Sequence, residues 1–172
     1  MIRKLTPDLF VPSIFAISLA RLGRRGIRGL IVDLDNTLVS WSEQEASSDL
    51  LTWIETAKQA GFRLCLLSNN LTLRVEHFAT LFDVPGIPRA GKPGRRAFRR
   101  AMDILGTGPE NTAVIGDQIF TDVFGGNRLH LYTILVRPVA DREFWSTRLV
   151  RRVERLFLPP GAGDTPSRRV PS

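Results

Sequence analysis

IVDLDNTL, residues 31–38, places two carboxylates two positions apart just as a short apolar run ends. In a β-strand, residues i and i+2 point to the same face, so Asp33 and Asp35 can point together beyond the carboxyl end of the strand. Open α/β sheets bind their ligands at that edge. Two carboxylates so close favour a bound divalent cation or a raised pKa on one of them, and both outcomes suit phosphoryl chemistry. The alternative is an Asp-rich turn in which Asn36 and Thr37 are ordinary turn and cap residues.

Two further segments carry groups that bind anions. The apolar run 64–67 leads into Ser68, which supplies a hydroxyl where a helix is expected to begin. Backbone N–H groups at a helix start also bind anions. Lys92 brings an ammonium group next to Pro93, which we expect at the first position of the following helix. Both segments therefore predict contacts to a phosphate.

A fourth segment repeats the pattern of the first. The apolar run 113–115 ends in Gly116 and is followed by two acids, Asp117 and Asp122. Four strand ends that each carry a phosphate-binding or metal-binding group favour one active site over four unrelated turns.

This order of acid pair, hydroxyl, lysine and acid pair resembles the haloacid dehalogenase-like (HAD) superfamily of phosphohydrolases. DLDNTL at 33–38, Ser68, Lys92 and GDQIFTD at 116–122 match its four motifs. The longer string GDQIFTDVFGGN, with the upstream PDLF and GIRGLIVDLDNTLVSW, is similar more narrowly to the YqeG-type subfamily, class IIIA, which is related to mitochondrial phosphatidylglycerophosphate phosphatases. The resemblance covers about residues 6 to 137.

The resemblance implies roles for the acids of the first and fourth motifs. Asp33 would be the nucleophile that attacks phosphorus and becomes an aspartyl phosphate, which water then hydrolyses. Asp35 would protonate the leaving oxygen and later deprotonate the water, because its nearness to a second carboxylate favours a held proton. Asp33 and Asp117, with the backbone carbonyl of Asp35, would bind Mg²⁺.

The other motif residues would handle the phosphate. Ser68, with Asn69 and nearby backbone N–H groups, would bind the phosphate oxygens, and Lys92 would neutralise the charge that builds on them. Asp122 would orient Lys92 or a metal-bound water. The alternative for Asp122 is an acid near the start of a helix that complements the helix dipole.

The alternation of strand and helix patterns predicts an α/β fold with a mostly parallel sheet covered on both faces. The resemblance implies the HAD-like (Rossmannoid) three-layer sandwich. About 30 residues separate the first motif from Ser68 and a little over 20 separate Ser68 from Lys92, which the helix of each parallel crossover fills. We therefore expect no cap domain. HAD enzymes commonly enclose small substrates with a cap, so an uncapped site resembles those that accept large substrates or borrow the surface of a neighbour.

Apolar stripes at helical spacing predict three helices. The first begins at Ser47 or Ser48 and ends at Gly61, and the third ends at Gly106. The inward residues are Leu50, Leu51, Ile54 and Ala57 in the first helix, Val75, Phe78, Ala79 and Phe82 in the second, and Ala97, Phe98, Ala101 and Leu105 in the third. Residues 131–136 are predicted to form the last strand.

The amino terminus, residues 1–20, superficially resembles a signal peptide, but Asp8 and Pro12 interrupt its apolar core. We expect instead an N-terminal segment, 1–28, that packs on the domain and carries a short helix closed by Gly23.

The length of 172 residues fits one domain, and the 43% hydrophobic content is ordinary for a globular protein. The HAD-like domain is predicted to span 29–157, followed by a disordered tail at 158–172. Cys65 is the single cysteine and is expected to pack in the core. No apolar stretch approaches the length of a membrane-spanning helix, and a cytoplasmic enzyme is expected.

The net charge of +7 bears on the partners of the protein. Arginines gather at 21–28, 95–100 and 142–155, and the last group falls on a predicted helix with an apolar stripe. The stripe consists of Trp145, Leu149, Val153 and Leu156. A surface helix docked on the sheet is favoured over an interfacial helix on anionic lipid at the inner membrane surface.

The sequence thus predicts a Mg²⁺-dependent phosphomonoester hydrolase, with phosphatidylglycerophosphate, an anionic phospholipid, as the most concrete substrate. The main alternative is a nucleic-acid or ribosome-associated binding protein with a residual HAD site, since a positive charge also favours RNA phosphate. A receiver-type signalling domain is a third alternative, but its phosphoacceptor lies on a later strand than its acid pair, which this motif order does not match. The oligomeric state stays open.

Overall fold

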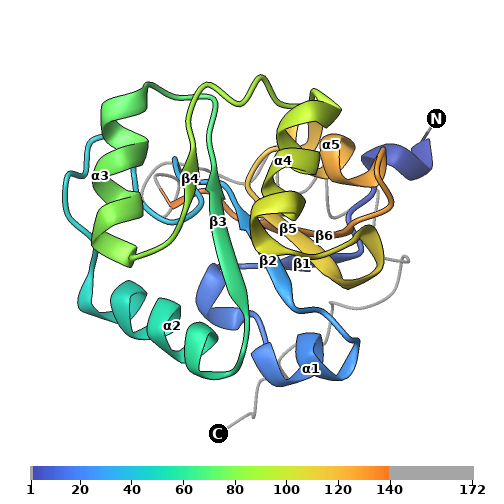
Figure 1. The fold of residues 1–172 in the computed structure, drawn as a ribbon, viewed down its shortest axis with the longest axis horizontal. Coiled ribbons are helices and arrows are strands. Elements are labelled where there is room, and N and C mark those ends of the chain that lie inside the picture. Colours follow the sequence, from blue (N-terminus) through green and yellow to red (C-terminus); the bar gives the residue numbers. More distant parts are fainter. Residues whose placement is uncertain (1, 140–172) are drawn as a thin grey trace, which may run out of the picture. The chain divides into compact units, whose positions relative to one another are not determined.

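A six-stranded parallel sheet forms the middle layer of the part of the chain that the computed structural model describes, residues 2–139 (Figure 1). The strands are β1 (Leu9–Val11), β2 (Gly29–Val32), β3 (Arg63–Leu67), β4 (Gly86–Ile87), β5 (Thr112–Gly116) and β6 (Tyr132–Val136). Their order across the sheet is β1-β6-β5-β2-β3-β4, and every neighbouring pair is parallel. The predicted α/β fold is confirmed, and within this range no connection is long enough to form a separate cap domain.

Helices cover both faces of the sheet. The α-helices are α1 (Leu19–Arg24), α2 (Ser48–Gln59), α3 (Thr72–Phe82), α4 (Arg95–Leu105) and α5 (Phe124–Asn127). Short 3₁₀ turns lie at η1 (Ile2–Leu5), η2 (Ile14–Ala16) and η3 (Pro109–Asn111), and a π-helical turn, η4, spans Ile119–Val123.

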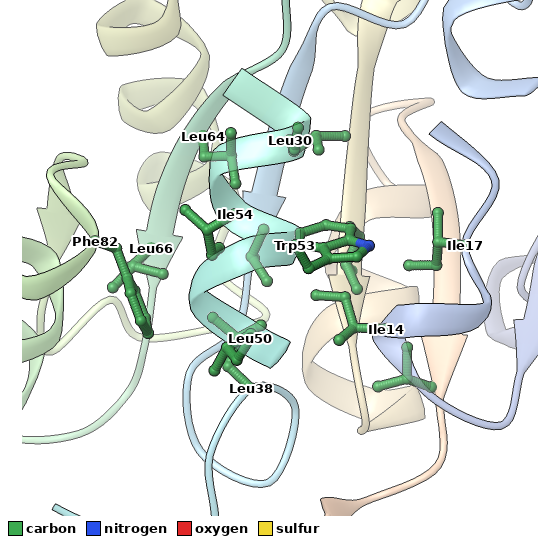
Figure 2. Close-up of a cluster of buried hydrophobic side chains, with 14 of the residues drawn as sticks. Ile14, Ile17, Leu30, Leu38, Leu50, Trp53, Ile54, Leu64, Leu66 and Phe82 are labelled. Carbon is green, nitrogen blue, oxygen red and sulfur yellow. The ribbon is translucent and has the colours of Figure 1, made fainter. Parts of the chain in front are cut away.

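Alternate residues of the central strands point into two separate apolar clusters. In β3, Leu64 and Leu66 pack with α2 and α3 on one face, whereas Cys65 and Leu67 pack with α4 on the other. Figure 2 shows the first cluster, in which Trp53 and neighbouring residues of α2 face the sheet. This alternation gives three layers, with the sheet buried on both faces as parallel sheets require.

The three predicted helical stripes face the core. All of their residues are buried except Leu51 and Ala79, which are half-buried and pack against the first cluster. Ser47 is the N-cap of α2, because its hydroxyl accepts a hydrogen bond from the N–H of Leu50 (3.2 Å). Gly106 ends α4 in the left-handed conformation, with a φ of 60°.

Two predicted helix boundaries were wrong. Pro93 is not the first residue of α4. It lies in a turn that the N–H of Gly94 closes on the carbonyl of Gly91, and the helix begins after this turn, at Arg95. Gly23 does not close α1, which continues through it to Arg24. The chain reverses instead at Gly26, whose φ is +82°.

The N-terminal segment contributes an edge strand that the sequence did not predict. β1 pairs with β6 in the register Leu9 to Ile134, and the Asp8 carboxylate accepts from the N–H of Thr133 (2.8 Å). The boundary at residue 28 stays a prediction. The predicted basic helix at 142–155 and the predicted tail at 158–172 lie outside the described residues. Among residues 2–139, no helix is long and apolar enough to cross a membrane.

Replacing Phe98 with alanine tests the packing of α4 on the sheet. The Phe98 ring is fully buried and fills the space beside Gly125, where an added Cβ would lie 2.5 Å from a ring carbon. The cavity left by Phe98→Ala should lower the free energy of unfolding by about 3–5 kcal/mol. Arg99→Ala, on the exposed face of the same helix, should change it by no more than about 0.5 kcal/mol. Equal losses in urea unfolding of the two variants would contradict this packing.

Candidate active site

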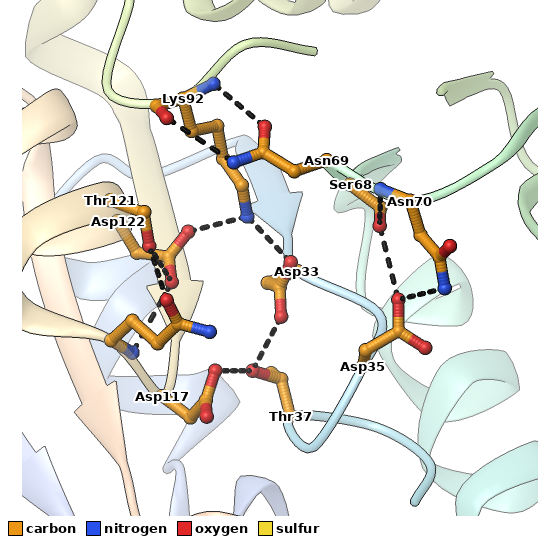
Figure 3. Close-up of polar contacts among 11 residues, drawn as sticks. Asp33, Asp35, Thr37, Ser68, Asn69, Asn70, Lys92, Asp117, Thr121 and Asp122 are labelled. Atoms are coloured by element: carbon orange, nitrogen blue, oxygen red, sulfur yellow. Dashed lines mark hydrogen bonds and ion pairs between the residues drawn. The ribbon is translucent and has the colours of Figure 1, made fainter. Parts of the chain in front are cut away.

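The sequence-predicted site residues lie at the carboxyl edge of the sheet, where β5, β2, β3 and β4 are consecutive neighbours (Figure 3). Asp33 and Asp35 follow β2, Ser68 and Asn69 follow β3, Lys92 follows β4, and Asp117 and Asp122 follow β5. Five of them, Asp33, Asp35, Ser68, Asn69 and Lys92, line a cavity of about 170 Å³, whereas Asp117 and Asp122 contact its lining residues Thr121, Lys92 and Gln118 or the turn residue Thr37. Its lining residues are Asp33, Asp35, Trp41, Ser68, Asn69, Asn70, Lys92, Gln118 and Thr121.

Lys92 lies at the centre of the site. Its buried ammonium group donates to Asp33 Oδ1 (2.5 Å) and to Asp122 Oδ1 (2.6 Å). Burial alone would lower the pKa of Lys92, but the charges of Asp122 and Asp33 outweigh burial and raise it above its ordinary value. The lysine is therefore a fixed positive charge between two carboxylates.

Asn69 holds the main chain of Lys92 in place. Its side-chain oxygen accepts from the N–H of Lys92 (2.7 Å), and its side-chain nitrogen donates to the carbonyl of the same residue (3.2 Å). Both polar atoms of this side chain are thus engaged, although the sequence predicted a contact to substrate. Asn69 joins the loop after β3 to the loop after β4.

Thr37 links the acids of the first and fourth motifs, and sequence reasoning missed this role. Its hydroxyl lies 3.2 Å from Asp33 Oδ2 and 3.3 Å from Asp117 Oδ1. Thr37 lies within a tight turn, in which Asn36 takes a φ of +62° and its N–H donates to the carbonyl of Val39, and this turn returns Thr37 toward the strand end. The only signal in the sequence is its place in DLDNTL.

Asp122 is buried beneath Lys92. Its second oxygen, Oδ2, lies 3.2 Å from the hydroxyl of Thr121 and 3.3 Å from the N–H of Gln118. Gly116 makes room for it, because an added Cβ there would lie 2.3 Å from the carboxyl carbon of Asp122. The π-helical turn η4 thus aims Asp122 back at the strand end from which it departs.

Three carboxylates form a cluster that suits a divalent cation. Oxygen atoms of Asp33, Asp117 and Asp122 lie within 4.8 Å of one another, opposite the single ammonium of Lys92. Burial, with the charge of Asp122 adding to it, raises the pKa of Asp33 to about 7, although Lys92 opposes the rise. Burial and Asp122 also raise the pKa of Asp117 to about 6. The cluster therefore holds more negative charge than the protein neutralises, and hard oxygen ligands of this kind fit a divalent metal ion.

Asp35 lies in a separate hydrogen-bonding group, as Figure 3 shows. Its carboxylate accepts from Ser68 (3.1 Å) and Asn70 (3.2 Å) through Oδ2, and from Arg74 Nε (2.7 Å) through Oδ1. The sequence placed this carboxylate beside that of Asp33. The structure instead turns it toward three donors on the far side of the cavity.

Arg74 is the second residue that sequence reasoning missed. Besides Asp35, its guanidinium donates to the carbonyls of Ser40 (2.8 Å) and Glu43 (2.7 Å), and it stacks over the ring of Phe78. It therefore ties the loop after β2 to the first turn of α3. A signal existed, because side chains in the first turn of a helix that follows a parallel strand lie near the ligand edge of the sheet.

The chain is similar to known hydrolases and phosphatases. A family model described as HAD-hydrolase-like matches residues 89–142. A Bacillus subtilis (strain 168) protein named "Probable phosphatase YqeG" is 44% identical over 152 residues, which cover 88% of each chain. The chloroplastic phosphatidylglycerophosphate phosphatase 1 of Chlamydomonas reinhardtii is 26% identical, and the match covers 88% of this chain and 60% of that relative.

The fold is also similar to that of solved structures. A predicted HAD-like family hydrolase from Porphyromonas gingivalis matches with a TM-score of 0.54 at 15% identity, over 78% of this chain and 99% of that one. At this identity the match supports the fold alone. The sequence match to the Bacillus protein shows that this chain belongs to the HAD-like hydrolases and, within them, to the family of the probable phosphatase YqeG.

Proposed function

We propose that the protein is a Mg²⁺-dependent phosphomonoester hydrolase that acts through an aspartyl phosphate on Asp33. The observation that carries the proposal is the placement of the Asp33 carboxylate, which lies in the cavity between the ammonium of Lys92 and the hydroxyl of Thr37. An oxygen of Asp33 would attack phosphorus in line, forming the new P–O bond as the bond to the alcohol oxygen breaks. Water would then hydrolyse the acyl phosphate and restore the carboxylate.

Mg²⁺ would be held by Asp33 and Asp117 with the carbonyl of Asp35, and it would supply charge neutralisation for the incoming phosphate. Lys92 would bind an equatorial phosphate oxygen while it stays paired with Asp122, which fixes its position. These contacts place positive charge where negative charge builds in the transition state.

Asp35 would act as the general acid and base, and its contacts suggest how this role is coupled to substrate binding. Ser68 and Asn70 both donate to the same oxygen, Oδ2. When the hydroxyl of Ser68 turns to a phosphate oxygen, that carboxylate oxygen loses one of its two donors and can carry the proton that Asp35 gives to the leaving oxygen. Arg74 would keep the other oxygen in place during the exchange.

For the substrate we propose phosphatidylglycerophosphate. The support is the distant similarity to the chloroplastic phosphatase, the absence of a cap domain among the described residues, and the net charge of +7, which favours an anionic surface. The nucleic-acid alternative is disfavoured, because buried acids repel RNA phosphate and carry out no evident task in a binding protein.

Asn substitutions at the two acids test the mechanism. Asp33→Asn should abolish turnover of a phosphomonoester, because an amide cannot attack phosphorus as a carboxylate does. Asp35→Asn should slow it by about 10²- to 10⁴-fold while still permitting phosphate binding. Asp103→Asn, at an exposed position of α4, is the matched control and should keep full activity. Wild-type activity in purified Asp33→Asn protein would refute the mechanism.

The acidic cluster predicts a stability that depends on pH and metal. Because the folded-state pKa values of Asp33 and Asp117 lie above 3.8, the folded protein binds more protons than the unfolded chain, and stability is lost as the pH rises through about 6 and 7. In chelator at about pH 8, Asp117→Asn should therefore raise the free energy of unfolding. The expected gain is about 1–2 kcal/mol, because the carboxylate of Asp117 is partly exposed, and it should shrink as the pH falls toward about 4.

Added Mg²⁺ should remove the stability advantage that Asp117→Asn has over the wild type in chelator. It should raise the melting temperature of the wild type at about pH 8 and raise that of Asp117→Asn much less, since the variant has lost a charged ligand. Activity should likewise stop in excess chelator and return with Mg²⁺. An equal Mg²⁺ effect on the melting of both proteins, or full activity in chelator with no metal retained, would count against the metal site.

The substrate proposal is tested by comparing two esters. The kcat/KM for phosphatidylglycerophosphate in mixed micelles should exceed that for glycerol 3-phosphate by about tenfold to a hundredfold, because two or three basic groups at an anionic surface each contribute about 1 kcal/mol. A preference for the soluble ester would refute the lipid substrate and leave the phosphatase proposal standing.

A further inference from the structure

The mouth of the cavity carries unusually exposed apolar side chains. Among the described residues, the four most exposed large hydrophobic side chains are Trp41 (59%), Leu71 (63%), Leu73 (81%) and Phe120 (71%). The other exposed ones, Phe10, Phe15, Leu81 and Ile104, reach only 40–45%. Scattered apolar residues are normal on a protein surface, so these four indicate a binding surface only if they lie close together.

Three of the four belong to segments that line the cavity, and Leu73 lies in the first turn of α3, just after one of these segments. Trp41 lines it, and Leu71 directly follows the lining residue Asn70. Phe120 lies between the lining residues Gln118 and Thr121. The segments follow β2, β3 and β5, so the side chains stand at the carboxyl edge of the sheet around one opening. We call this set, Trp41, Leu71, Leu73 and Phe120, the apolar rim.

Arginines stand at the same edge. Arg89 is exposed, and its N–H donates to the carbonyl of Asn70 (3.0 Å), which places it beside the cavity. Arg95 and Arg96 are exposed in the first turn of α4, shortly after Lys92. The loop after β2 also carries the exposed acids Glu43 and Glu45, so positive charge prevails on the α4 side of the opening only.

We propose that the apolar rim inserts into the headgroup region of an anionic bilayer, so that the cavity opens directly onto the membrane surface. The inference rests on the proposed function, since it names the surface at which that site would work. Tryptophan favours this interface, and leucine and phenylalanine gain free energy by leaving water. The arginines add attraction to anionic headgroups.

The size of the cavity fits this arrangement. A volume of about 170 Å³ accommodates a phosphate group and the atoms beside it but is too small for acyl chains. With the rim in the interface, a lipid phosphomonoester could enter the cavity while its chains stay in the bilayer. A second copy of the chain on the rim would instead close the opening.

Vesicle flotation with the full chain tests the proposal. The wild type should float with phosphatidylcholine vesicles that contain phosphatidylglycerol, and less with phosphatidylcholine alone. Leu73→Ser and Phe120→Ser should each lower the partition coefficient by about tenfold, whereas Phe120→Trp should keep it. These lipids hold no phosphomonoester, so binding is measured without turnover and stays interpretable even if the proposed phosphatase activity fails.

The matched controls lie near the amino edge of the sheet. Leu81→Ser, near the end of α3, and Ile104→Ser, near the end of α4, replace exposed apolar residues away from the rim and should leave partitioning unchanged. Circular dichroism should show that all variants are folded. The proposal is overturned if the wild type fails to float, or if control and rim variants lose binding equally. Self-association that Phe120→Ser abolishes, with no vesicle binding, would overturn it as well.

Discussion

The ammonium of Lys92 between Asp33 and Asp122 is the contact on which the site depends. It joins the loop after β4 to the loops after β2 and β5 in a largely buried region, where an unpaired charge would be costly. Other features serve this contact, because Asn69 fixes the main chain of the lysine and Gly116 leaves the space that Asp122 occupies. The central position of β2 in the strand order places its end within reach of both neighbouring loops.

One ammonium does not balance three carboxylates. Burial first, and the charge of Asp122 second, raise the pKa values of Asp33 and Asp117, and in the absence of a cation this cost opposes folding. The uncompensated negative charge lowers the stability of the fold, and the same charge provides affinity for a metal ion. The hydroxyl of Thr37 lies near Asp33 and Asp117 but can donate only one proton, so it stabilises the negative charge of one of these acids at a time.

The sequence predicted those parts of the molecule that depend on local pattern. Apolar runs that end in Asp33, Ser68 and Asp117 predicted parallel strands with polar ends, and a parallel sheet brings such ends together. It did not predict contacts that depend on side-chain direction. Arg74 reaches Asp35 only because the first turn of α3 faces the loop after β2. Three-residue β1 was missed for a related reason, since its pairing with β6 lies far away in the sequence and its own pattern is too short to be distinctive.

The burial of the site makes a cap, which is absent among the described residues, unnecessary for shielding the phosphoryl group. Asp33 and Lys92 are already shielded by the fold itself, at 7% and 8% exposure, so the phosphoryl group would leave water without a lid. What stays outside is the leaving alcohol, for which residues 2–139 provide no cap domain. Selection must then come from whatever covers the opening. The exposed side chains around that opening include apolar ones on the segments after β2, β3 and β5 and arginines on the α4 side, while the acids Glu43 and Glu45 belong to the loop after β2. A surface with an apolar interior and anionic headgroups complements the apolar rim and the arginines.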